Sequence, residues 1–453
     1  MYNTSKLYIS LGIMGMLTAN PATAQQAGHQ PEQISLQKAI DLALQNNRGL
    51  AIRKLQVAEK QAKLKEDEVK KYPSVTVNST YQYNANTGSL VIDQGSFGVL
   101  PLNATTQVPL PNETKTFNLG QHHTINAGIM AYQPITQLGK VKTGLAIDQT
   151  DIQVSEQERR KAALQIRQAV ERLYYGLLIN QQQQTEAASK LDVAKLKLYD
   201  VESALGSGKT INVSKAGLQA NIADEEQNLL KLAIQREDYE TDLKRLTGIK
   251  ADSLVLAGVE LTQIAVPSLD SVALSALRNN VDIQLATLGQ QKAQLGIKAA
   301  QQSYRPDVGV LAGYTYQQGN LIFPVNNPYV GVNLKWNLQD LVANKQVMTQ
   351  RNLIRQQAQE NLLNTQEQVS SDLEKAYRKI SQARALIDVA QKAARYRAEE
   401  LKVQQDRQAA GLNLKSDLLT AQSNLAKAQV DLLAAQLNYQ LAVLDVNLLT
   451  GTL

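Results

Sequence analysis

Two stretches of the chain, YPSVTVNSTYQYN at residues 72–84 and RPDVGVLAGYTYQ at residues 305–317, repeat one spacing of proline, valine and tyrosine. They interrupt a sequence that is rich in Gln, Ala and Leu and elsewhere has the pattern of helices. From Val75 to Tyr83 the odd positions are mainly apolar and the even positions are all polar. Because successive side chains of a strand point to opposite faces, both stretches predict a strand with one mainly apolar face and one polar face.

The repetition extends beyond the strands and indicates a tandem duplication. An offset of 233 carries ALQNN at 43–47 onto ALRNN at 276–280 and then runs through both strand stretches without a gap. Later in the chain an offset of 203 carries Gly208 onto Gly411. The two offsets differ by 30 residues, which fall in a loop at about 85–123 that is longer in the first unit than in the second.

The duplication divides the chain into structural repeats at 25–250 and 268–453, joined by a connector at 251–267. Each repeat predicts a short and a longer helix, two strands separated by a loop, a very long helix and a return helix. The very long helices, at about 139–205 and 342–409, contain no proline. At ~1.5 Å per residue each would span ~100 Å, so we expect each to pack along its return helix as an extended hairpin.

The second return helix carries a heptad seam. Its apolar residues are spaced alternately four and three apart, as in a coiled coil: Ala421, Leu425, Ala428, Leu432, Ala435, Tyr439, Ala442, Val446 and Leu449. Alanines alternating with larger residues allow neighbouring helices to approach closely. A soluble coiled-coil scaffold would explain this seam equally well, but it would not explain the strands.

The second strand of each repeat, at 125–131 and 330–336, alternates in the same way. Four amphipathic strands of about ten residues, with aromatics near their ends, have the pattern of a transmembrane β-barrel wall. An ordinary half-buried antiparallel sheet shares this alternation. The long hairpins offer no layer to cover the apolar face, however, and an open sheet cannot stand in lipid because its edge groups would lack partners. Since single-chain barrels have at least about eight strands, we expect several chains to build one barrel.

The aromatic residues of the strands are candidates for interfacial girdles, because Tyr and Trp concentrate where the lipid core meets the headgroups. Strand propensity alone would also place aromatics there. The candidates are Tyr81, Tyr83, Tyr132, Tyr314, Tyr316, Tyr329 and Trp336.

The first 24 residues have the pattern of a cleaved signal peptide, with an apolar run at 7–17 and Ala22-Thr23-Ala24 before the cleavage point. We expect no transmembrane helix in the rest of the chain. There is no cysteine and there are three histidines, and the formal charge of +6 is scattered without a dense Lys/Arg block. We therefore expect no cofactor, no metal site (His122-His123 included), no nucleic-acid partner and no enzymatic activity. GSGK at 206–209 lacks the spacing of a phosphate-binding loop.

Together these features resemble the TolC-type outer-membrane efflux and secretion proteins, also called outer membrane factors, over essentially the whole mature chain. The resemblance is carried by four motifs: the duplicated A-L-x-N-N element, the P-x-V-x-V strand opening, the spacing from Gly411 to Asp417, and the A-Q-x-x-L-x-x-A run from Ala421. The C-terminal ending departs from the family's pattern, since Asn438-Tyr439 is followed by Gln440-Leu441-Ala442. The match is one of spacing and character rather than of every letter.

The resemblance implies an α+β membrane protein. Three chains would form a homotrimer whose duplicated helical hairpins make a periplasmic α-barrel, with the connector in its equatorial region. Four strands per chain would make a transmembrane β-barrel of twelve strands. The implied function is that of a passive exit duct of a tripartite efflux pump or type I secretion system, in the outer membrane and extending into the periplasm. Its implied partners are outer-membrane lipid, a periplasmic adaptor (membrane fusion) protein and an inner-membrane transporter.

The resemblance also implies that the hairpin turns form the periplasmic entrance. Asp417 matches the family's acidic entrance position, where three carboxylates would form a selective and gating ring. The second acid of the family's pair is replaced by Thr420, and the first repeat has Ser214 at the place equivalent to Asp417. An Asp in the first helical turn, after Ser416 as a possible N-cap, is also favoured by the helix dipole without any role in a pore.

The turns themselves are the candidate contacts for the adaptor, although helix reversal alone would explain their glycines. These candidates are Gly206, Gly208, Lys209, Gly411, Asn413 and Lys415. The alternative function is that of a periplasmic coiled-coil adaptor or scaffold protein of the same export machinery. An adaptor normally has a single hairpin, so the duplication and the two-faced strands argue against it.

Overall fold

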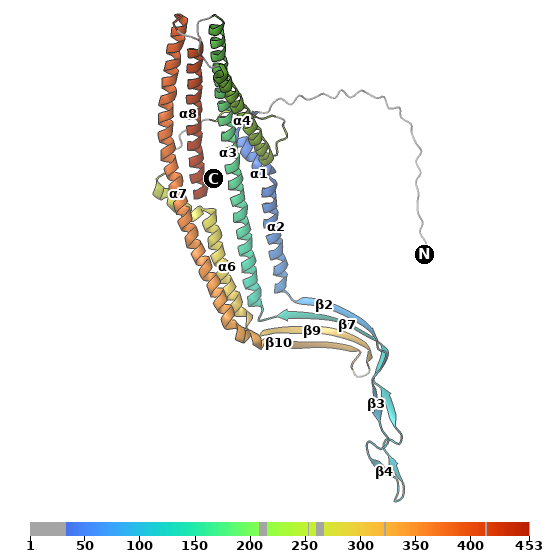
Figure 1. Cartoon of the computed structure of the whole chain (residues 1–453). Helices are drawn as coiled ribbons and strands as arrows, with labels where there is room; N and C mark the ends of the chain where they lie inside the picture. Colours follow the sequence, from blue (N-terminus) through green and yellow to red (C-terminus); the bar gives the residue numbers. More distant parts are fainter. Residues whose placement is uncertain are drawn as a thin grey trace, which may run out of the picture.

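Two antiparallel pairs of long helices dominate the computed structural model, which describes residues 33–207, 215–251, 253–259, 267–320, 323–412 and 415–452. One pair is α3 (Leu138–Gly206) with α4 (Lys215–Thr247), and the other is α7 (Leu338–Ala409) with α8 (Lys415–Thr450) (Figure 1). The predicted long helices are confirmed, with bounds that differ from the prediction by at most four residues. The expected signal peptide lies outside the described residues.

Shorter helices pack beside the long ones (Figure 1). Each repeat has a short helix followed by a longer one: α1 (Leu36–Asn46) and α2 (Arg48–Glu68, continued by a 3-10 turn at Val69–Lys71), then α5 (Leu269–Asn279) and α6 (Val281–Ser303). α2 lies against α3 and α6 against both α7 and α3. The order short helix, longer helix, two long strands, long helix, return helix therefore occurs twice along the chain.

The duplicated Asn-Asn motif has a local structural cause. Asn47 and Asn280 are the N-caps of α2 and α6, and the Asn280 side-chain oxygen accepts bonds from the backbone N–H groups of Asp282 and Ile283 at 2.9 and 3.1 Å. The side-chain nitrogen of Asn280 donates to the Leu449 carbonyl at 2.9 Å. Each motif thus starts one helix and ties it to the end of the return helix, where Gly451 adopts a φ of +63° that a side chain would disfavour.

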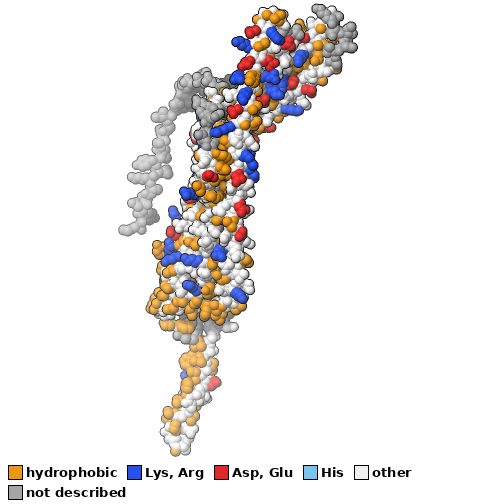
Figure 2. Space-filling model, turned by 90° about the vertical axis from the view of Figure 1, so that its left-hand side faces the viewer, with side chains coloured by type: hydrophobic (Ala, Val, Ile, Leu, Met, Phe, Trp, Pro, Cys, Tyr) orange, Lys and Arg blue, Asp and Glu red, His pale blue; other side chains and the backbone are white. Residues whose placement is uncertain are grey.

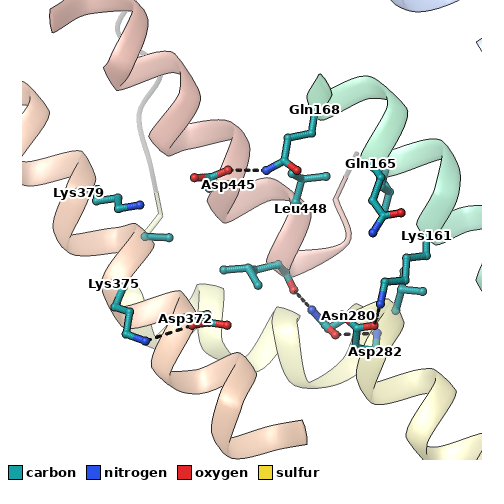
Figure 3. Close-up of a pocket in the computed structure, with 14 residues that line it drawn as sticks. Lys161, Gln165, Gln168, Asn280, Asp282, Asp372, Lys375, Lys379, Asp445 and Leu448 are labelled. Atoms are coloured by element: carbon teal, nitrogen blue, oxygen red, sulfur yellow. Dashed lines mark hydrogen bonds and ion pairs between the residues drawn. The ribbon is translucent and has the colours of Figure 1, made fainter. Parts of the chain in front are cut away.

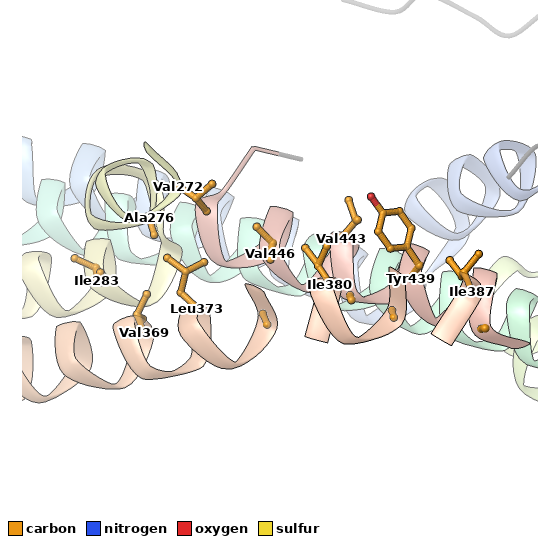
Figure 4. Close-up of a cluster of buried hydrophobic side chains, with 14 residues drawn as sticks. Val272, Ala276, Ile283, Val369, Leu373, Ile380, Ile387, Tyr439, Val443 and Val446 are labelled. Carbon is orange, nitrogen blue, oxygen red and sulfur yellow. The ribbon is translucent and has the colours of Figure 1, made fainter. Parts of the chain in front are cut away.

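The heptad seam of α8 is buried as predicted. Tyr439, Ala442 and Val446 pack on Leu373 and Ile380 of α7 in one apolar cluster, which Figure 4 shows from the side. The first return helix, α4, is covered to a lesser extent, because its buried residues lie only in its last turns. α8 is also long and apolar enough to cross a membrane by length and composition alone, contrary to the expectation from sequence. Its packing against α7 and α3 gives those apolar residues a partner within the protein.

A second apolar cluster joins the two repeats at mid-height. Tyr174 of α3 is fully buried, and its hydroxyl lies 2.8 and 2.6 Å from the carbonyl oxygens of Ile34 and Ala257. Ile34 is the last residue of β1 (Gln33–Ile34), and Ala257 directly follows β8 (Val255–Leu256). These two strands form a short parallel pair. Leu437 of α8 belongs to the same cluster. The N-terminal segment, the connector and both hairpins are held together here.

Four long strands form one antiparallel sheet at the end of the helices (Figure 1). The spatial order is β10 (Asn326–Lys335), β9 (Asp307–Asn320), β7 (Gly120–Pro134) and β2 (Ser74–Tyr83). The predicted strands are thereby confirmed, although β7 and β9 are longer than expected. The sheet extends away from the helical bundle, and no described helix covers either of its faces.

The loop expected at 85–123 is instead a projecting β-arm. Beyond β2 the chain forms β3 (Ser89–Ile92) and β4 (Val99–Pro101), and it returns through β5 (Gln107–Pro109) and β6 (Lys115–Asn118). β3 pairs with β6 and β4 with β5, in sheets separate from the main one. Figure 2 shows charged side chains over the helices and apolar side chains over the sheet and the arm.

Candidate functional site

One face of the four-stranded sheet is apolar from edge to edge. Residues that pair directly across strands share a face, and the register aligns Val77, Ile129 and Tyr314 in one row and Ala131, Ala312 and Val330 in another. These side chains have no cover within the described chain: Val77 is 77% exposed and Val330 is 79% exposed. An apolar surface of this extent on a folded chain marks an interaction site for protein or lipid.

The opposite face is polar and nearly free of charge. It presents mainly hydroxyl and amide side chains and glycines, including Thr76, Asn78, Asn126, Thr315 and Asn333, with Met130 and Leu311 among them. Hydroxyls of this face bond to backbone carbonyls across the strands, as Thr315 does to Asn327 at 3.3 Å. Its charged residues, Asp307 and Lys335, pair across strands at the helix-proximal end, where the Lys140 ammonium lies 2.9 Å from Asp307. Such a face can line an aqueous passage of low charge.

Two of the predicted girdle residues lie on the wrong face. Tyr132 pairs across strands with Ser74, and Tyr329 pairs with Gly313, so both belong to the polar face. Tyr132 covers Gly309 so closely that a Cβ added at this glycine would clash with the phenol ring. Tyr329 covers Gly313 in the same way. These tyrosines fill gaps above glycines and are removed from the candidates for an outward girdle.

The remaining aromatics also lie on the apolar face or beside it. Tyr81 and Tyr83 are within the last three residues of β2, at the end far from the helices, whereas Tyr314 and Tyr316 lie nearer the middle of β9. Trp336 follows the last residue of β10 at the helix-proximal end, and its indole N–H donates to the Tyr304 carbonyl at 3.1 Å. Eight residue steps from Val75 to Tyr83 correspond to about 26 Å along a strand. This length is comparable with the apolar band of a transmembrane barrel, which is about 25 Å tall.

His122 and His123 lie beside Tyr81 and Tyr83 at the end of the sheet far from the helices. The Tyr81 hydroxyl lies 2.8 Å from Nδ1 of His123, and the Tyr83 ring lies against both histidine rings, with centroids 6.0 and 5.2 Å apart. Nδ1 of His122 is 2.8 Å from the Asn84 carbonyl oxygen. Among the described residues, no three His, Cys, Asp or Glu side chains gather as a metal site would require.

The sheet has two open edges of equal length. β2 and β10 are its outer strands, each of ten residues, and each pairs on one side only. All neighbouring strands are antiparallel, so β2 and β10 run in opposite directions. The β10 edge of one copy could therefore continue the antiparallel pattern on the β2 edge of another.

The helical tips are only partly within the described residues. Gly206 ends α3, Gly411 follows α7 with a φ of +70°, and Lys415 begins α8 with an exposed side chain. The Lys215 ammonium at the start of α4 pairs with Glu202 of α3 at 2.8 Å and so closes the first tip. The other tip candidates, Gly208, Lys209 and Asn413, lie outside the described residues, as does Ser214.

Asp417 and Thr420 occupy different environments. Asp417 is exposed in the first turn of α8. Thr420 is half-buried, its hydroxyl donates to the Ser416 carbonyl at 2.7 Å, and it lines a groove between the two hairpins. Ser416 is the second residue of α8 and is nearly buried, so it is not the N-cap that the sequence suggested. The hairpin groove, of about 360 Å³, is also lined by Lys190, Lys197 and Asp224.

A second groove, which sequence reasoning missed, lies where α3, α6, α7 and α8 meet (Figure 3). It encloses about 340 Å³, and its charged groups include two ion pairs, Lys161 with Asp282 at 2.6 Å and Lys375 with Asp372 at 3.3 Å, together with Lys379. Gln168 donates to Asp445 at 2.8 Å across the junction of the repeats. The contacts of Lys161 and Gln168 join helices of the two repeats.

A carboxyl pair lies where α2 meets α3, near the sheet. Asp148 is almost fully buried and one of its oxygens has no hydrogen-bond partner. Burial, followed by the adjacent Asp67 carboxylate, raises the pKa of Asp148. Hydrogen bonds from Lys70 and Lys63 lower the pKa of Asp67 to about 2. At this contact between α2 and α3, the Asp67 carboxyl is therefore held in its charged form, whereas the Asp148 carboxyl binds a proton more readily than usual.

Comparison with known proteins identifies relatives of this architecture. The sequence profile of the outer membrane efflux protein family matches residues 39–249 and 272–452. No curated protein matches the chain by sequence. The chain is similar to the structure of the Campylobacter jejuni CmeC outer membrane channel, with 18% identity and a TM-score of 0.72 over 92% of this chain and 85% of that one.

Two further solved structures share the fold. A membrane protein from Pseudomonas aeruginosa is 15% identical, with a TM-score of 0.70 over 92% of this chain and 90% of that one. The open state of the Neisseria gonorrhoeae MtrE outer membrane channel is 17% identical, with a TM-score of 0.67 over 92% of this chain and 88% of that one. At these identities the likeness shows a common fold.

Proposed function

The chain belongs to the outer membrane efflux protein family, and from this premise we propose that it is the passive exit duct of a tripartite efflux pump or type I secretion system. Three copies build one channel. Their sheets close into a barrel of twelve strands across the outer membrane, and their helical hairpins form a hollow cylinder in the periplasm. Substrate enters at the helical tips and leaves through the barrel.

One observation carries this proposal: the sheet has an uncovered apolar face and two open edges of opposite direction. In lipid, unpaired backbone groups at an edge cost several kcal/mol each, so the edges must pair. Four strands are too few to close alone. Edge pairing of β2 with β10 of the next copy satisfies both edges of every chain and keeps the pattern antiparallel.

The inward surface then follows from the register. The apolar face contacts lipid, and the polar face with Asn78, Asn126 and Asn333 lines the passage. Tyr81 and Tyr83 form the outer girdle, and Trp336 belongs to the girdle on the periplasmic side. Tyr314 and Tyr316 lie on the same face, nearer the middle of β9. The passage carries little charge, so it conducts without binding its cargo strongly.

The helical tips are assigned to docking and gating. Gly206, Gly208, Lys209, Gly411, Asn413 and Lys415 contact the hairpin of a periplasmic adaptor, which links the duct to an inner-membrane transporter. Asp417 of three copies lines the entrance, and the neutral Thr420 and Ser214 make this ring weaker than one built from paired acids. The energy for transport comes from the transporter.

Fractionation and crosslinking of the expressed chain test this function. The duct predicts a trimer that sediments with the outer membrane and conducts ions in planar bilayers. The other candidate, a periplasmic coiled-coil adaptor or scaffold, predicts a chain in the soluble periplasmic fraction without conductance. A soluble monomer would overturn the duct.

A further inference from the structure

The β-arm at residues 85–119 has no packing partner elsewhere in the part of the chain that the structure describes. Its strands pair only with each other, as β3 with β6 and β4 with β5. None of its side chains is buried. An isolated two-stranded ribbon is at best marginally stable in water, and a hydrophobic face needs a third strand or another layer. The arm therefore needs a cover that a single chain does not supply.

The surface of the arm is apolar rather than charged. Its exposed large apolar residues are Leu90, Val91, Phe97, Val99, Leu100, Leu102, Leu110 and Phe117. Phe97 is 73% exposed, and the arm holds two of the three phenylalanines of the chain. Its only charged residues are Asp93, Glu113 and Lys115, and the last two pair with each other. If the arm stood alone in water, these exposed apolar side chains would make no stabilising contact.

The position of the arm points to a second copy of this chain as the cover. The arm leaves the sheet from β2, which is an edge strand, and returns into β7 beside it. In a closed barrel with four strands per chain, at ~4.8 Å per strand, equivalent arms leave the wall about 20 Å apart. The outgoing strand from Ala85 to Pro101, if fully extended at ~3.3 Å per residue, reaches about 55 Å. Neighbouring arms can therefore meet.

We propose that the arms of adjacent chains pack against one another through their apolar side chains, above the outer mouth of the barrel, and narrow that mouth. This proposal rests on the trimeric duct proposed above. Few charges lie on the arms, so three copies can approach without strong repulsion. The exit would then be lined by an apolar constriction that is absent from the polar wall below it.

The chain has no cysteine, so a single introduced thiol gives an unambiguous test. Phe97→Cys and, separately, Leu102→Cys are placed in the full-length trimer, and Val310→Cys is the matched control. Val310 is also exposed and apolar, but it lies on the central strand β9 and faces away from the passage. Mild oxidation is followed by gel electrophoresis with and without reductant and by conductance in planar bilayers.

The proposal predicts reducible covalent dimers for both arm variants, none for Val310→Cys, and a loss of conductance on oxidation that reductant restores. An intact, conducting trimer without arm dimers overturns the arm proposal alone, since its arms then stand apart or lie in lipid. Dimers without loss of conductance also overturn it, because the arms would then pack away from the mouth. A monomeric chain overturns both this proposal and the duct.

Discussion

Single side chains decide the electrostatics of the proposed entrance. Asp417 is exposed at the start of α8, and the hydroxyl of the neighbouring Thr420 donates a hydrogen bond to the Ser416 carbonyl. A ring at this level therefore depends on one carboxylate per chain.

Replacing Asp417 by Asn is expected to lower the preference of the channel for cations over anions, because the ring of carboxylates that concentrates cations is removed. Reversal potentials in a salt gradient across a planar bilayer measure this preference. Asp417→Glu is the control and should retain it. An unchanged reversal potential in Asp417→Asn would take this residue out of the entrance.

The buried Asp148 makes a prediction about pH. Because its pKa is raised in the folded protein, chiefly by burial, the ionised form destabilises the fold. Its contribution is most favourable below the unfolded pKa of 3.8 and is lost as the pH rises through the folded value. Asp148→Asn should therefore raise the melting temperature at pH 7, and the gain should shrink toward pH 3.

The matched control for Asp148→Asn is Asp151→Asn, one turn further along α3, where the carboxylate pairs with Lys292 at 2.6 Å. This control removes an ion pair and should give no gain in stability at pH 7. Melting curves of both variants at the two pH values make the comparison. A gain for Asp148→Asn that is the same at pH 3 as at pH 7 would show that ionisation is not its cause.

The sequence predicts on which face of the sheet a strand residue lies, and it does so only through the alternation of apolar and polar positions. Ile125, Ala127, Ile129 and Ala131 set the apolar parity of β7, and Tyr132 has the opposite parity. The same reasoning separates Tyr329 from Val330 in β10. The alternation of the sequence places both tyrosines on the polar face, whereas aromatic character alone does not distinguish the two faces of a strand.

At the level of elements, the long helices are stabilised by the seam between α7 and α8. Leu373 is 2% exposed in this seam, whereas Leu386 of the same helix is 59% exposed. Truncating a buried leucine removes its transfer free energy and leaves a cavity, at a cost of about 2–5 kcal/mol.

Leu373→Ala should therefore lower the free energy of unfolding by this amount, while Leu386→Ala should change it by no more than about 0.5 kcal/mol. Denaturant unfolding of the detergent-solubilised protein, followed by the helical circular dichroism signal, gives both values. Equal effects of the two substitutions would mean that the face carrying Leu386 is also buried in the assembled protein.

The helices were predictable because a heptad repeat and the absence of proline are strong local signals, whereas the arm was not. Its strands are three or four residues long, and they are separated by Gly, Pro, Asn and Thr residues typical of loops. No alternation long enough to indicate a strand is present there. Pairing between distant short segments, such as Leu90 with Phe117, decided the structure instead.

At the scale of the whole molecule, the sheet of the proposed duct is complete only in a membrane and only with copies of itself. The uncovered apolar face and the open edges are both present in the structure of a single chain. The number of chains does not follow from local patterns, because closure depends on how the edges of neighbouring copies meet. The even number of strands per chain allows antiparallel closure with any number of copies, and the trimer is a proposal that follows from the family relationship.

The most direct test compares two adjacent positions of β2 in the cysteine-free chain after reconstitution into liposomes. Val77 belongs to the apolar face and Asn78 to the polar face, and both are exposed. The account predicts that Asn78→Cys reacts with a water-soluble maleimide while Val77→Cys does not, and that a fluorophore at Val77→Cys is quenched by a lipid-bound quencher. Equal reaction of both thiols with the maleimide, without quenching by lipid at either, would contradict it.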